Sequence, residues 1–127
     1  MSGWITRIRC YVSPAGNNKI RDWHDSLSTQ EKADADTFLR LMRKTRNWQL
    51  PNYRPRLANV KKIGELRWTS VKRQHRLLGF FGDGVWYALV GCTHKQQIYD
   101  PPDALSTAQK YRGQIEKGEV ETVEYDL

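Results

Sequence analysis

Residue types that could cleave an RNA phosphodiester gather in the second half of the chain. Arg67 and Arg76 fall in two segments predicted to be strands, while His94, Lys95 and Tyr99 follow a third. The planar fork of an arginine matches two phosphate oxygens. An imidazole can give or take a proton near neutrality, and a lysine can act as a base when burial and neighbouring cations lower its pKa. Tyr99 can stack on a base or donate a proton, so these five residues are the predicted catalytic set.

Three further bases, Lys61, Lys62 and Arg73, are predicted to bind RNA, and they belong to an uneven distribution of charge. The chain has 21 Lys and Arg against 14 Asp and Glu, a net charge of +7. The segment from Glu116 onward carries −4, which leaves +11 on residues 1–115. A body this basic attracts polyanions such as nucleic-acid backbones, with ordinary solubilising charge as the simpler alternative. We expect the acidic segment to lie near the basic face or to be displaced by a partner.

The apolar pattern predicts one domain over residues 1–118 and an acidic C-terminal tail over residues 119–127. Alternation with period two, and a hairpin signal at residues 82–84, predict strands at 4–12, 63–69, 74–81 and 85–93. The weak alternation of the tail fits either a final strand or disorder.

Capping signals and helical spacing predict three helices. Asn17 or Asn18 can cap the first, and Ser28 with Glu31 forms a capping box at the start of the second. Asp100, followed by two prolines, is the predicted cap of the last. The predicted fold is therefore α+β in the order β-α-α-β-β-β-α, an antiparallel sheet with two N-terminal helices and one C-terminal helix packed on one face.

Several other residues have plainer interpretations. Trp68 and Trp86 are predicted to lie in the core, His75 to be structural and His24 to lie at the surface.

The remaining composition bears on compartment and cofactors. Cys10 and Cys92 lie in apolar strand-like segments, which predicts buried free thiols in a reducing compartment. There is no secretory signal and no apolar run near the roughly 20 residues of a membrane span, so we expect a cytoplasmic protein without membrane contact. Three His and two Cys show no metal-ligand spacing, and no phosphate-cradling glycine loop occurs, so no metal or cofactor is expected.

Three ordered motifs resemble a known family. GELRW, RQHRLLGFF and VWYALVGCTHKQQIYDPP, with a hairpin between the last two and a helix after them, resemble the HigB-like, phage-derived branch of the RelE/ParE superfamily. The likeness covers roughly residues 57–115. It implies a RelE-like fold and the toxin of a type II toxin–antitoxin pair: a metal-independent endoribonuclease, or mRNA interferase, that cleaves mRNA on the ribosome. Its partners would be mRNA, the ribosome and a cognate antitoxin, expected to be a helix-turn-helix protein.

The resemblance can be carried over at three positions. Arg67 matches the arginine of the family's "ELR" strand, Arg76 the arginine of its "YR" strand, and Lys95 the first lysine of its turn. The chain departs where Gln96 and Tyr99 stand in place of lysines that the family commonly has. Fewer cations would weaken phosphate binding.

His94 and Tyr99 are the residues expected to compensate for that loss, and two alternatives stay open. One is a ParE-like gyrase inhibitor of the same fold that does not cut RNA. The other is a non-catalytic phage or prophage protein that binds RNA or protein.

Overall fold

The computed structural model describes residues 5–55 and 63–125. Within them the chain forms one mixed seven-stranded sheet with the order β2-β3-β4-β5-β1-β7, in which β6 also pairs with β5. The strands are β1 (Arg7–Tyr11), β2 (Tyr53–Arg54), β3 (Gly64–Ser70), β4 (Arg73–Gly82), β5 (Val85–Lys95), β6 (Ile98–Asp100) and β7 (Thr122–Glu124). The helices are α1 (Lys19–Asp25), α2 (Thr29–Arg43) and α3 (Ala104–Glu116).

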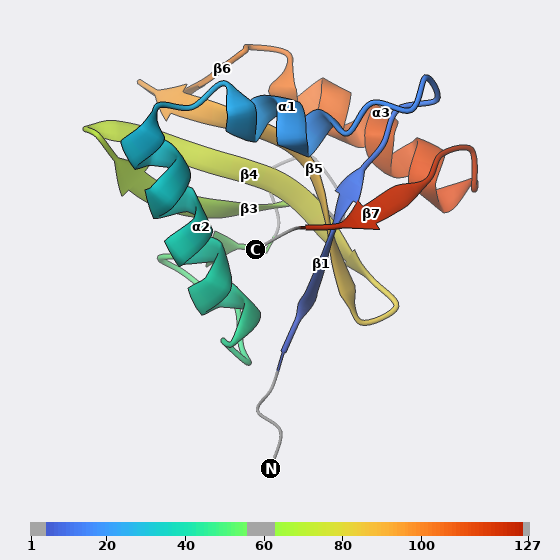
Figure 1. The fold of residues 1–127 in the computed structure, drawn as a ribbon, viewed down its shortest axis with the longest axis horizontal. Coiled ribbons are helices and arrows are strands. Elements are labelled where there is room, and N and C mark those ends of the chain that lie inside the picture. The colour runs from blue at the N-terminus through green and yellow to red at the C-terminus, as the bar shows by residue number, and fades with distance from the viewer. Residues whose placement is uncertain (1–4, 56–62, 126–127) are drawn as a thin grey trace.

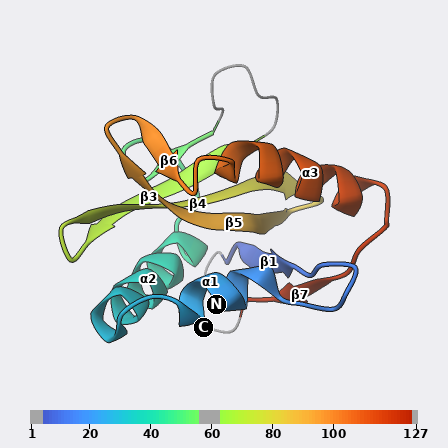
Figure 2. The ribbon, with the colours of Figure 1, turned by 90° about the horizontal axis from the view of Figure 1, so that it is seen from above.

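The expected α+β class and the order of the main elements are confirmed, with two corrections. All neighbouring strands are antiparallel except β1 and β5, which run parallel, so the sheet is mixed. The helices do not share one face: Figure 2 shows α1 and α2 on one side of the sheet and α3 on the other. The short strands β2 and β6 were not predicted, and of the two alternatives for the tail the structure shows a strand, β7.

Local signals explain where the helices begin. The Ser28 hydroxyl accepts a hydrogen bond from the Glu31 backbone N–H, and the Glu31 carboxylate accepts one from the Ser28 N–H, so the predicted capping box starts α2. Asn18 caps α1, because its side-chain oxygen accepts hydrogen bonds from the backbone N–H groups of Ile20 and Arg21. The predicted cap of the last helix was wrong: α3 is preceded by Asp103, because Asp100 belongs to β6.

Each face of the sheet has its own apolar core. The cluster against α1 and α2 contains Ile8, Cys10, Ile20, Leu39, Met42, Tyr53, Leu66, Leu77, Trp86 and Ala88. The cluster against α3 contains Tyr11, Ile63, Leu78, Phe80, Leu89, Cys92, Ala104 and Ala108. Successive side chains along β3, and likewise along β4, therefore lie on opposite faces of the sheet. Glu65, Arg67 and Arg76 lie on the face that α3 covers.

A β-bulge in β5 decides which of its side chains reach the α3 face. Leu78 pairs with Val90 and Gly79 with Ala88, so Leu89 is an extra residue in the ladder. Leu89 and its neighbour Val90 consequently both pack against the α3 cluster. Beyond the bulge Cys92 faces α3, whereas before it Trp86 and Ala88 face α1.

The C-terminal segment forms β7 and lies beside β1, at the far edge of the sheet from β2 and β3 (Figure 1). Glu124 forms ion pairs with Arg7 and Arg9. Residues 119–125 therefore lie beside the bases of β1 and not beside those predicted to bind RNA, while displacement of the segment by a partner stays a prediction. Both cysteines, Cys10 in β1 and Cys92 in β5, are free and buried, as predicted. No described helix is long and apolar enough to cross a membrane.

Candidate active site

A buried carboxylate that the sequence analysis did not single out stands at the centre of the candidate site. Glu65 on β3 is only 4% exposed. Its Oε1 lies 3.5 Å from Arg67 Nε and 3.7 Å from Arg76 Nε, and its Oε2 accepts a 2.5 Å hydrogen bond from the Tyr99 hydroxyl. Three of the five predicted catalytic residues thus contact one acidic side chain. We call Glu65, Arg67, Arg76, Tyr99 and His94 the Glu65 cluster.

Strand register explains why the two arginines meet. Arg67 and Arg76 are directly opposite each other on the antiparallel strands β3 and β4, so both side chains leave the same face. The sequence predicted this shared face. It did not predict Glu65, although the spacing of two between Glu65 and Arg67 places these residues on one face of a strand.

Arg76 is a buried residue, which does not fit its predicted place among the catalytic residues that contact the phosphate. It is 5% exposed, and its Nη1 and Nη2 donate to the His75 carbonyl at 2.9 Å and to Gln74 Oε1 at 3.1 Å. Burial lowers the pKa of its guanidinium, and Glu65 opposes that change. The Arg76 guanidinium is therefore held by hydrogen bonds to its own strand and supplies a buried positive charge beside Glu65.

Arg67 is the accessible arginine of the cluster. Its side chain is 32% exposed, and its ion-pair partner among the described residues is Glu65 at 3.5 Å. That distance is longer than an ordinary hydrogen bond, so Arg67 keeps donors that can turn toward an external anion.

His94 and Tyr99 enter the cluster from the β5–β6 hairpin. The two residues are paired across its strands, with ring centroids 5.1 Å apart. Burial lowers the pKa of His94, and the nearby Arg76 lowers it further. Burial also raises the pKa of Tyr99, and its hydrogen bond to Glu65 adds to the rise, so its hydroxyl stays protonated.

The other predicted site residues lie elsewhere. Lys95 is exposed and follows His94 along β5, so strand alternation directs it to the opposite face. Arg73 is on that opposite face too, 3.6 Å from Glu31 of α2, and so it is separate from the cluster. Lys61 and Lys62 lie outside the described residues.

Two histidines outside the cluster have structural partners. His75 is fully buried, as a structural residue should be, with its Nε2 2.9 Å from Glu31 Oε2. Burial raises the pKa of Glu31, but hydrogen bonds from Ser28 and the nearby Arg73 outweigh it and hold that pKa below its usual value. His24 is not a free surface residue as predicted: it is half-buried and contacts Asp36 at 2.9 Å.

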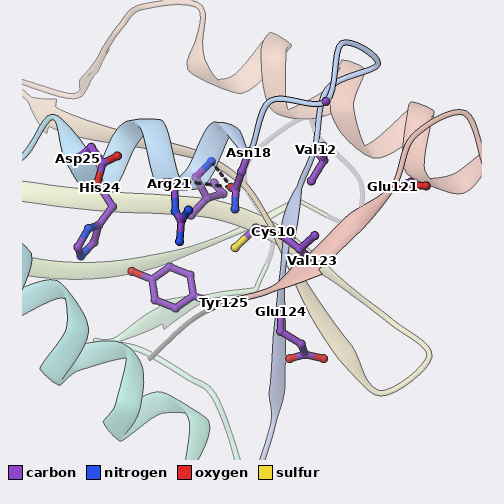
Figure 3. Close-up of a pocket in the computed structure, with 12 residues that line it drawn as sticks. Cys10, Val12, Asn18, Arg21, His24, Asp25, Glu121, Val123, Glu124 and Tyr125 are labelled. Carbon is purple, nitrogen blue, oxygen red and sulfur yellow. Dashed lines mark hydrogen bonds between the residues drawn. The ribbon is translucent and has the colours of Figure 1, made fainter.

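A separate pocket of about 650 Å³ lies between α1 and the β1–β7 edge (Figure 3). Its apolar floor includes Cys10 and Val123, and its rim carries Arg21 and Glu124. Burial raises the pKa of the Cys10 thiol to about 12, so it is not a nucleophile near neutrality. No group of three or more potential metal-ligating His, Cys, Asp or Glu occurs among the described residues. His24 and Tyr125 also line the pocket, and both contact Asp36.

Comparison of the chain with protein-family models, with curated proteins and with solved structures gave no match.

Burial of Arg76 leads to a prediction about stability. We expect Arg76→Ala to lower the free energy of unfolding by about 3–5 kcal/mol, because it leaves the buried Glu65 charge without its buried cation. Arg67→Ala should cost no more than about 1 kcal/mol, because its ion pair is partly exposed. Urea unfolding of both variants checks this, and equal midpoints for Arg76→Ala and wild type would show that Arg76 has no structural role.

Proposed function

We propose that this protein is the toxin of a type II toxin–antitoxin pair, a metal-independent endoribonuclease that cleaves mRNA on the ribosome. The observation that carries the proposal is the convergence of Arg67, His94 and Tyr99 around the buried carboxylate of Glu65. The resemblance of the GELRW, RQHRLLGFF and THKQQIYDPP segments to HigB-like toxins supplies the biological setting, including a helix-turn-helix antitoxin.

Arg67 is assigned to the scissile phosphate. RNA cleavage by attack of the 2′-hydroxyl passes through a phosphorane that carries more negative charge than the phosphodiester. A guanidinium placed to contact its oxygens stabilises that charge most in the transition state. The partial exposure of Arg67 and its long contact with Glu65 suit it to this role, whereas the buried Arg76 supports the cluster from beneath.

His94 is assigned to removing the proton of the 2′-hydroxyl, and the leaving 5′-oxygen takes its proton from solvent water. Burial and Arg76 lower its pKa, so the imidazole is neutral at pH 7, which is the form that accepts a proton. The paired ring of Tyr99 gives a surface on which a base can stack. Its hydroxyl is held by Glu65 and so positions the ring rather than titrating.

One observation favours the alternative of RNA or protein binding without cleavage. Lys95 lies on the other face and Arg76 is buried, so the cluster offers one partly exposed arginine where the family commonly has several cations. A gyrase supercoiling assay tests the other alternative, a ParE-like protein, since only an inhibitor of gyrase would block supercoiling.

Cleavage of a synthetic RNA in excess EDTA tests the proposal. We expect wild type to cut, because the chemistry uses side chains alone. Arg67→Ala and His94→Ala should slow single-turnover cleavage by about 100-fold or more, the usual effect of losing a charge stabiliser or an acid–base group. Arg40→Ala on the outer side of α2 is the charge-matched control and should cleave like wild type. Cleavage that stops in EDTA and returns with magnesium would contradict a metal-independent mechanism.

The lowered pKa of His94 predicts how cleavage depends on pH. A proton acceptor works in its neutral form, so the rate should rise with pH through a midpoint below 6.5 and stay level from about pH 7 to 8. His94→Ala should lose this rise. A single-turnover rate that falls between pH 6 and 8 would instead make His94 the proton donor.

A further inference from the structure

Glu65 presents the arginines with an anion before any substrate arrives. Its Oε1 lies between Arg67 Nε and Arg76 Nε, at 3.5 and 3.7 Å. Both distances exceed those of good hydrogen bonds, and neither guanidinium grips the carboxylate with a parallel pair of N–H donors. The buried Nε of Arg76 has no hydrogen-bond partner in the described part of the chain. These are loose ion pairs, of a kind that another anion can replace.

The two arginines differ in their freedom to leave Glu65. Arg76 is buried and tied through Nη1 and Nη2 to the His75 carbonyl and to Gln74. Arg67 is about one-third exposed, and Glu65 is its ion-pair partner. Only Arg67 can therefore turn outward without breaking hydrogen bonds to the strand.

Glu65 would keep two other partners if Arg67 turned away from it. Arg76 remains against its Oε1, and the Tyr99 hydroxyl continues to donate to its Oε2 at 2.5 Å. The carboxylate would thus keep one cation and one hydrogen bond while Arg67 is engaged elsewhere. A buried charge with both partners removed would be strongly destabilising.

We propose that Glu65 is a positioning residue that competes with the RNA phosphate for Arg67 and so lowers the affinity for RNA. This inference rests on the proposed function, because it concerns the same arginine. Arg67 is exchanged between two anions: Glu65 holds it in the free protein, and the scissile phosphate takes it on binding. When the product leaves, Glu65 reclaims the guanidinium. The carboxylate therefore weakens the binding of a phosphate that must displace it from Arg67.

The test measures binding of a 2′-O-methyl RNA oligonucleotide, which cannot undergo 2′-hydroxyl attack, by fluorescence anisotropy. Glu65→Gln keeps the shape of the side chain and an acceptor for Tyr99 but removes the competing charge. We expect it to bind the RNA about fivefold tighter than wild type, the effect of releasing one partly exposed ion pair. Glu119→Gln, an exposed residue with the same change in net charge, is the matched control and should bind like wild type.

A double-mutant cycle with Arg67 shows whether the effect passes through that residue. In an Arg67→Ala background, Glu65→Gln should no longer tighten binding. If Glu65→Gln binds no tighter than wild type, or tightens binding equally without Arg67, the proposal is overturned. Should Glu65→Gln fail to fold, Glu65→Asp keeps the charge and withdraws it by one methylene, and it must then bind tighter than wild type.

Failure of this inference and failure of the nuclease are distinguishable, because binding of the methylated RNA requires no cleavage. Wild type that cuts RNA while Glu65→Gln binds no tighter would refute the competition alone. Tighter binding by Glu65→Gln in a protein that never cuts RNA would support the competition and refute the nuclease.

Discussion

A carboxylate that is only 4% exposed stays charged in a protein interior when cations and hydrogen-bond donors replace the water that solvated it. Glu65 obtains these from Arg67, Arg76 and Tyr99, on three different strands. The need to compensate this one charge ties together β3, β4 and β6 at the end of the sheet where β5 turns into β6. Arg67 and Tyr99, which are proposed to act on RNA, thus also help to compensate the buried carboxylate.

Alternation along the strands was enough to predict part of this arrangement. It places Arg67 and Arg76 on one face, and their direct pairing follows from the antiparallel register. It says nothing about what covers that face, and so it could not predict that Arg76 is buried. The same limit applies to Glu65, whose burial comes from tertiary contacts with a tyrosine 34 positions later.

The position of His94 depends on a feature without a clear local signal. Unbroken alternation from Trp86 would place His94 with Trp86 and Ala88, on the face covered by α1. The extra residue Leu89 reverses the parity, so His94 joins the Glu65 cluster. Gly91 in β5 was one hint of irregular strand geometry in the sequence. In the structure Trp23 packs over this glycine so closely that a Cβ would fall 2.2 Å from the indole. The continuous apolar run of β5 was likewise a sign that both faces of the sheet are covered.

The chemical nature of the cleaved ends tests the central claim most directly, because attack by the 2′-hydroxyl leaves a mark that other routes do not. Purified protein is incubated with a short synthetic RNA, and the products are weighed by mass spectrometry. We expect a 2′,3′-cyclic phosphate, or the monophosphate formed when it hydrolyses, on one fragment and a 5′-hydroxyl on the other. A 3′-hydroxyl paired with a 5′-phosphate would mean that water attacked the phosphate, and it would contradict the roles assigned to Arg67 and His94.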